Sequence, residues 1–212
     1  MSERIAGIDI TDSRLVSEAT ELVRDVASPL LFHHSRRVFL FGSLQGNRLG
    51  LAADPELLYI GAMFHDLGLT EKYRRTDQRF EIDGADEARR FLTAHGLPED
   101  RIRLAWLGIA LHTTPETPYH LEPEVALVTA GVETDVLGIG YADLDPILID
   151  AVVNAHPRPD FKRQILQAFT NGFKDRPDTT FGTVNADVLA HFVPGFIRTD
   201  FVEVIQSNAW PE

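Results

Sequence analysis

The stretch 54-DPELLYIGAMFHDLG-68 decides the fold class, because it combines a helix start, a buried apolar run and a polar end. Asp54 is a favoured N-cap residue and Pro55 a favoured first helical residue, so a helix is predicted to begin there. The apolar run is long enough for a core-facing helix, and it ends at His65 and Asp66. Both of these side chains can bind metal, so the stretch also raises the question of why His65 and Asp66 lie at the edge of a hydrophobic core.

The sequence on both sides of this stretch repeats the helical pattern. Within 11–27, apolar residues recur at spacings of three, four and seven, as on one face of an α-helix. Asp83 is expected to cap a helix that stops at Gly96. Convincing strand alternation is missing from the sequence, so an all-α, single-domain helical bundle is predicted. Further helices are expected within 30–44, 97–113, 122–138, 143–156, 160–173, 184–192 and 199–208.

Composition excludes several classes of function. The 212 residues suit one domain, and the absence of cysteine excludes disulfides, thiolate metal sites and a cysteine nucleophile. A net charge of −12 argues against long nucleic acid or an anionic membrane as the main partner. The N-terminus lacks a signal-peptide pattern, and no apolar run is long enough to span a bilayer. A cytoplasmic protein with a small-molecule substrate is expected, and a homo-oligomer remains possible.

Four polar residues interrupt stretches that should face the core: His34, His65, Asp66 and Asp135. A single histidine of this kind is usually structural, but burying isolated carboxylates costs on the order of several kcal/mol unless each is paired or bound to a cation. Two imidazoles and two carboxylates around one divalent metal would remove that cost. Nitrogen and oxygen ligands without sulfur suit Zn²⁺ first, with Fe²⁺, Mn²⁺ and Ni²⁺ as alternatives.

The order His34 … His65-Asp66 … Asp135 resembles the HD superfamily of metal-dependent hydrolases, whose signature is H…HD…D on a helical bundle. The motif "HSRRV" favours His34 over His33 as its first histidine. The resemblance implies one HD-type domain over 1–212, with a metal-binding core at about 25–140 and a pocket-closing part at about 141–212.

Other stretches resemble the cyanamide hydratase-like branch of that superfamily, which adds water to N≡C–NH₂ and releases urea. They include "FHDLGLTEKY", "IALHTT" and "RPDTTFGT", in an order that covers roughly residues 25 to 190. In this reaction a bound metal lowers the pKa of its water to about 7 and so supplies hydroxide at neutral pH. The implied activity is that of a hydratase, a lyase by class.

Four residues are candidates for the catalytic steps: Asp66, Thr70, His112 and Glu81. The resembled hydratases place a small hydroxyl residue near the metal, which is the expectation for Thr70. His112 ends an apolar stripe and either contacts substrate or caps its helix. Glu81 either supports a metal ligand or transfers a proton. Asp66, Thr70 and His112 are the candidate proton relays.

Two other functions remain open. The first alternative is an HD phosphohydrolase acting on a nucleotide or other small phosphate ester. Leu69 argues against the 5'-deoxynucleotidase type, which has a glutamate at that place. At least three of the four basic residues Arg36, Arg37, Lys72 and Arg74 are expected on solvated helix faces rather than at a phosphate. The second alternative is a metal-holding regulatory domain without turnover.

Overall fold

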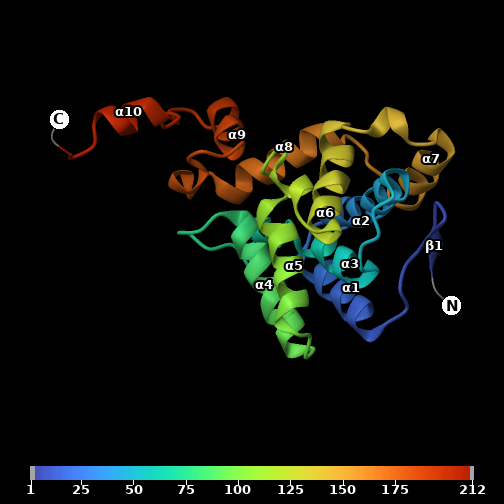
Figure 1. Ribbon diagram of the computed structural model, residues 1–212. Helices are drawn as coiled ribbons and strands as arrows, with labels where there is room; N and C mark the ends of the chain where they lie inside the picture. Colours follow the sequence, from blue (N-terminus) through green and yellow to red (C-terminus); the bar gives the residue numbers. More distant parts are fainter. Residues whose placement is uncertain (1–2, 211–212) are drawn as a thin grey trace.

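The computed structural model describes residues 3–210 and shows a helical bundle with one small hairpin (Figure 1). The predicted all-α class is confirmed. The α-helices are α1 (Arg14–Val26), α2 (Pro29–Leu49), α3 (Pro55–Phe64), α4 (Phe80–Ala94), α5 (Glu99–Leu111), α6 (Pro123–Val132), α7 (Pro146–Ala155), α8 (Phe161–Phe173), α9 (Asn185–Phe192) and α10 (Phe201–Gln206). Short helical turns are η1 (Leu67–Leu69), η2 (Thr117–His120), the π-helical η3 (Glu133–Leu137), η4 (Tyr141–Asp143) and η5 (Pro177–Thr180).

Helix α3 begins as its sequence predicts. The Asp54 carboxylate accepts hydrogen bonds from the backbone N–H groups of Glu56 and Leu57, and Pro55 occupies the first turn. Residues 57–64 are all buried, because α3 lies between α1, α2, α5 and α6. The helix therefore ends inside the molecule, and this is what buries His65 and Asp66.

Helix α2 is the centre of the bundle and packs most closely against α6. Gly131 allows that approach, since a Cβ atom there would lie 2.1 Å from the carbonyl oxygen of Val38. The close contact continues into η3, which extends α6 by one π-helical turn. Turns of this kind are frequent at functional sites. The packing brings Asp135, on η3, next to the first half of α2.

A second, smaller apolar cluster joins α8 and α9 to the main bundle. Phe161, Ile165 and Phe173 of α8 pack with Leu69 and Phe80, which flank the loop that follows the HD pair. The C-terminal helices thereby cover one side of the region around His65 and Asp66.

Three local expectations differ from the structure. A two-stranded antiparallel hairpin, β1 (Arg4–Ile5) and β2 (Ile8–Asp9), precedes α1, although no strand was expected. Helix α4 begins at Phe80, so Asp83 lies in its first turn and does not cap it. Arg36 and Arg37 are both buried, although at most one of the four basic candidates was expected away from solvent.

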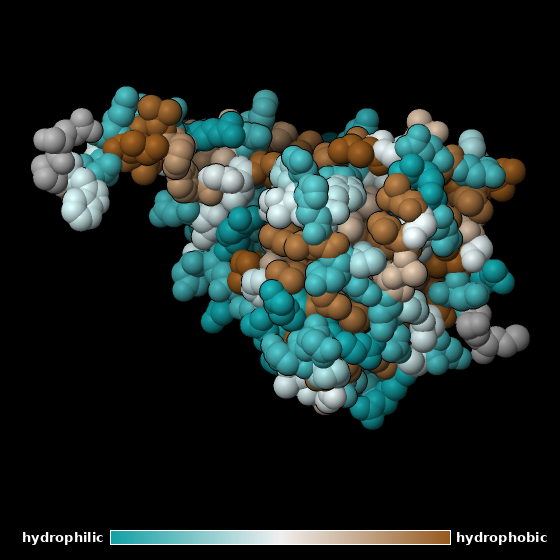
Figure 2. All heavy atoms as spheres, in the orientation of Figure 1, coloured by the Kyte–Doolittle hydropathy of each residue, from teal (hydrophilic) through white to brown (hydrophobic). Residues whose placement is uncertain are grey.

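Helix α10 extends away from the bundle at the C-terminal end of the described chain (Figure 1). Figure 2 shows hydrophobic side chains gathered on this arm, where Phe201, Val202 and Ile205 are exposed. Within residues 3–210, no helix is both long and apolar enough to cross a membrane.

Candidate metal centre

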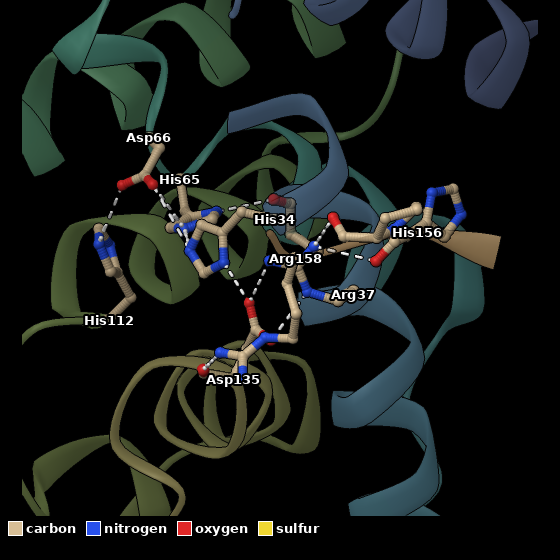
Figure 3. A network of polar contacts seen from close by, with 10 residues as sticks. His34, Arg37, His65, Asp66, His112, Asp135, His156 and Arg158 are labelled. Carbon is tan, nitrogen blue, oxygen red and sulfur yellow. Dashed lines mark hydrogen bonds and ion pairs between the residues drawn. The ribbon is translucent and has the colours of Figure 1, made fainter. Parts of the chain in front are cut away.

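Three predicted ligands meet in the interior. His34 lies in the second turn of α2, His65 directly follows α3, and Asp66 precedes η1. All three are buried, and one potential ligand atom from each lies within 4.8 Å of the others. The two Nε2 atoms are 3.1 Å apart, and Asp66 Oδ2 lies 3.6 Å from His34 Nε2 and 3.3 Å from His65 Nε2 (Figure 3).

The Nδ1 atoms of both histidines are already engaged. His65 Nδ1 lies 2.7 Å from the carbonyl oxygen of Ala62, and His34 Nδ1 lies 2.7 Å from Asp135 Oδ2. Carbonyl and carboxylate oxygens only accept hydrogen bonds, so in both neutral rings the proton belongs on Nδ1. Each Nε2 is then left with a free lone pair directed towards Asp66. Metal-bound histidines typically have such an arrangement.

His112, which directly follows α5, has the same orientation. Its Nδ1 lies 2.6 Å from the carbonyl oxygen of Ile109, and its Nε2 lies 3.9 Å from Asp66 Oδ1. The His65 and His112 rings meet edge to face, with centroids 4.8 Å apart. The Nδ1 contact is the one expected if His112 caps α5. The Nε2 atom faces the Asp66 carboxylate, so His112 is the third imidazole beside it.

The Asp66 carboxylate provides the test of whether a cation fits. Both oxygens are buried, and neither has a hydrogen-bond partner among the described residues. A buried ionised carboxylate without a donor is costly. Three imidazole lone pairs around it offer no compensation, whereas a divalent cation among these atoms would satisfy all of them. The donor set of imidazole nitrogen and carboxylate oxygen suits Zn²⁺ or another first-row metal.

Asp135 reaches the cluster from its outer side. Its Oδ2 contacts His34 Nδ1, and its carboxylate also accepts two hydrogen bonds from Arg37, at 2.8 Å to Oδ1 and 2.9 Å to Oδ2. Arg158 adds an ion pair at 3.4 Å to Oδ1 and donates at 2.6 Å to the Asp135 carbonyl oxygen. The His34 ring therefore stands between Asp135 and the shared centre (Figure 3). In this geometry Asp135 orients His34.

Burial and neighbouring charges set the protonation states of the cluster. Burial alone would raise the pKa of Asp66, but the charges of His65 and His34 outweigh burial and hold this pKa well below its ordinary value. Burial also acts to raise the pKa of Asp135, and His34 and Arg37 hold it well below its ordinary value. Burial, with His65 close by, lowers the pKa of His112 to about 4. Burial acts to lower the pKa of His65, but the neighbouring Asp66 carboxylate outweighs burial and raises it. The ionised carboxylates and the neutral His112 are therefore ready for a metal, whereas a metal would displace a proton from His65.

The other two catalytic candidates lie in different surroundings. Thr70 donates its hydroxyl to the Leu67 carbonyl oxygen at 2.7 Å and lines a hollow between the start of α2 and α8, away from Asp66. Its expected role near the metal stays a prediction. Glu81 is fully buried and accepts hydrogen bonds from Arg79 at 2.9 Å, Thr113 at 2.5 Å and Asn185 at 3.0 Å.

Three residues of this region were missed by sequence reasoning. Asn185 and Thr113 line the same cavity as Asp66, and Arg158 holds Asp135. Asn185 follows the "RPDTTFGT" stretch, so the resemblance of that stretch was a signal for its neighbourhood but not for the residue. Arg158 stands in the stretch 156-HPRPDF-161, where nothing local indicates its partner.

Comparison with known families agrees with this geometry. The model of the HD domain matches residues 31–144, which is more than half of the chain and includes all of the histidines and aspartates described above. No curated protein matches the chain. The chain belongs to the HD-domain family, whose members are in general metal-dependent hydrolases.

Proposed function

We propose that this protein is a metal-dependent enzyme that adds water to a small uncharged substrate, in the manner of the cyanamide hydratase-like branch. In this proposal His34, His65 and Asp66 hold one divalent ion, Zn²⁺ first, and His112 completes the set. The carrying observation is the buried Asp66 carboxylate, unpartnered among the described residues and faced by imidazole nitrogens. A divalent ion at such a site supplies water that is acidic enough to attack at neutral pH.

The cavity beside the metal cluster favours an uncharged substrate. It has a volume of about 260 Å³, and His34, His65, Asp66 and His112 form one end of its wall. Among the described residues that line it there is no lysine or arginine, and Glu133 adds negative charge. A phosphate ester would bring more negative charge to a wall without a cationic side chain. This argues against the phosphohydrolase alternative.

Residues around the cluster have distinct positioning roles in this proposal. Asp135, held by Arg37 and Arg158, fixes the His34 ring so that Nε2 faces the centre. Glu81 fixes Thr113 and Asn185 at the cavity wall, where their polar atoms can orient a substrate head group.

The two parts of the chain have different roles in this function. The core of about 25–140 carries the metal ligands. The part from 141 onward contributes Leu166, Phe169, Val184, Asn185 and Val188 to the cavity wall and so closes it.

The direct test combines metal content with a substrate panel. The purified protein is expected to contain a stoichiometric divalent ion by elemental analysis and to release urea from cyanamide. His65→Ala and Asp66→Ala are each expected to lose the ion and to reduce turnover to background. Phosphate release from nucleotides without urea formation would establish the phosphohydrolase function instead. Metal binding without any turnover on the panel would favour a regulatory domain.

A matched histidine variant controls for folding. His95 follows α4, with its Nε2 at 2.8 Å from Glu18 on the surface, and it does not line the cavity. His95→Ala is expected to keep both the ion and the turnover. A loss of metal in this variant equal to that in His65→Ala would mean that the cluster residues act through general stability.

A further inference from the structure

The wall of the Asp66 cavity is apolar away from the metal end. The side chains there come mainly from η3 and its approach, from α8, and from α9 with the residue before it, and they include Val132, Val136, Leu166, Phe169, Val184 and Val188. The polar lining beyond the ligand cluster consists of Thr113, Thr114, Glu133 and Asn185, among the described residues. Larger hollows of about 340 and 530 Å³ lie elsewhere, but neither is lined by His34, His65 or Asp66.

Cyanamide would fill only a part of the cavity. At about 30 Å³ for each water-sized group, the 260 Å³ cavity has room for about nine non-hydrogen atoms. Cyanamide has only three such atoms, so most of the cavity would hold water against valine, leucine and phenylalanine side chains. Water in that position gains little from the wall, and a hydrocarbon group that displaces it binds favourably.

Asn185 places one polar group on this wall. Its Nδ2 donates to Glu81 at 3.0 Å, which fixes the amide plane. An asparagine amide has a second N–H and an acceptor oxygen, and no described residue bonds to either of them. These two groups can recognise a polar head that carries both a donor and an acceptor, next to the metal end.

We propose, on the basis of the function proposed above, that the substrate carries a nitrile-like or amide-like head at the metal end and a hydrocarbon substituent of about four to six carbons. The substituent lies along the wall formed by Val136, Leu166, Phe169 and Val188. Substituted cyanamides or aliphatic nitriles are then better substrates than cyanamide itself. A substituent with negative charge is disfavoured along this wall, where Glu133 is acidic and no described lining residue is a lysine or arginine.

The first experiment measures binding and does not depend on turnover. Straight-chain alkyl hydroxamates, from acetyl to decanoyl, are titrated calorimetrically into the zinc-supplemented full-length protein. The hydroxamate group binds at the metal end in every compound, so the compounds differ only in the length of the alkyl chain. The affinity is expected to rise by about fourfold for each methylene up to about six carbons and then to level off. An affinity that is independent of chain length, or highest for acetohydroxamate, would overturn the proposal.

A variant at the apolar wall locates the effect. Leu166 is 37% exposed, so Leu166→Gln is tolerated by the fold, and it should reduce the ratio of hexanoyl to acetyl affinity several-fold. Ile147→Gln is the matched control, because Ile147 is 75% exposed on α7 and outside the cavity. An unchanged ratio in Leu166→Gln would contradict the assignment of the wall.

The second experiment separates this inference from the proposed function. The kcat/KM for cyanamide is compared with those for N-butylcyanamide and pentanenitrile. A higher kcat/KM for the butyl compounds than for cyanamide supports both the proposed function and the inferred hydrocarbon substituent. Hydration of cyanamide without any preference for the longer chain keeps the proposed function and overturns the inference. Chain-dependent hydroxamate binding without hydration of any nitrile keeps the apolar pocket and overturns the proposed function.

Discussion

At the scale of a single residue, Asp135 is the predicted ligand that contacts the cluster through another predicted ligand, His34. The motif places this aspartate with the ligands, while its carboxylate contacts His34 Nδ1 and Arg37. A carboxylate behind a metal-bound histidine typically contributes 10–100-fold to metal affinity. We therefore expect Asp135→Asn to weaken zinc binding by about that factor in a chelator competition, and Asp66→Asn to weaken it much more.

Two comparisons make this prediction specific. Asp143 is an exposed aspartate on η4 that pairs with Arg48 at 3.8 Å, so Asp143→Asn should leave zinc affinity unchanged. If Asp135→Asn removed zinc binding as completely as Asp66→Asn, Asp135 would be a direct ligand. The competition assay thus distinguishes a ligand from a residue that orients one.

At the scale of elements, Arg176 holds several helices together. Its buried guanidinium pairs with Asp83 of α4 and donates to the carbonyl oxygens of Gly68, Arg75, Gln78 and Gly172. It thereby joins the end of α8 to η1 and to the start of α4. The segment that follows Arg176 runs through η5 to α9 and supplies Val184, Asn185 and Val188 to the cavity.

Loss of Arg176 should therefore loosen the wall of the cavity. Removing one partner of a buried ion pair costs about 3–5 kcal/mol, so Arg176→Met is expected to lower the free energy of unfolding by about that amount in urea. Amide hydrogen exchange in 177–190 should accelerate most. Arg14→Met is the control: Arg14 pairs with Glu18 at 3.4 Å on the exposed face of α1, and exposed pairs contribute about 0–1 kcal/mol. Equal losses in the two variants would refute the role of Arg176.

The elements also show what the sequence could and could not predict. His34, His65 and Asp66 were predictable because each interrupts a local apolar pattern, and the helices because caps and periodicity are local signals. Which nitrogen of His34 faces Asp135 depends on the packing of α2 against α6 and η3, which no spacing encodes. At least three of the four basic candidates were expected in solvent, and the buried Arg37 could not be singled out because its partner lies 98 positions away. Asn185 was missed because its partner, Glu81, is 104 positions away.

His156 couples the stability of the whole molecule to pH. It directly follows α7, where its Nε2 accepts a hydrogen bond from Arg36 Nε at 3.2 Å and its Nδ1 lies 3.1 Å from His33 Nδ1. Arginine only donates, so Nε2 carries a lone pair and protonation there would break the contact. Burial, together with the charges of Arg36, His33 and Arg37, lowers the pKa of His156 to about 3.

The sign of the pH effect follows from this lowered pKa. Above pH 6.5 His156 is neutral in both states and has no effect, but between about 6.5 and 3 the unfolded chain binds a proton that the folded chain does not. His156 should therefore reduce the free energy of unfolding by up to about 1.4 kcal/mol per pH unit as the pH falls through that range. In His156→Gln the amide oxygen can still accept from Arg36 and does not titrate, so urea unfolding of chelator-treated protein should show a shallower decline between pH 6 and pH 4. Exposed His191→Gln, the control, should follow the wild type. Parallel curves for the wild type and His156→Gln would mean that the fold accommodates the protonated ring, and that Arg36 can turn away from it at little cost.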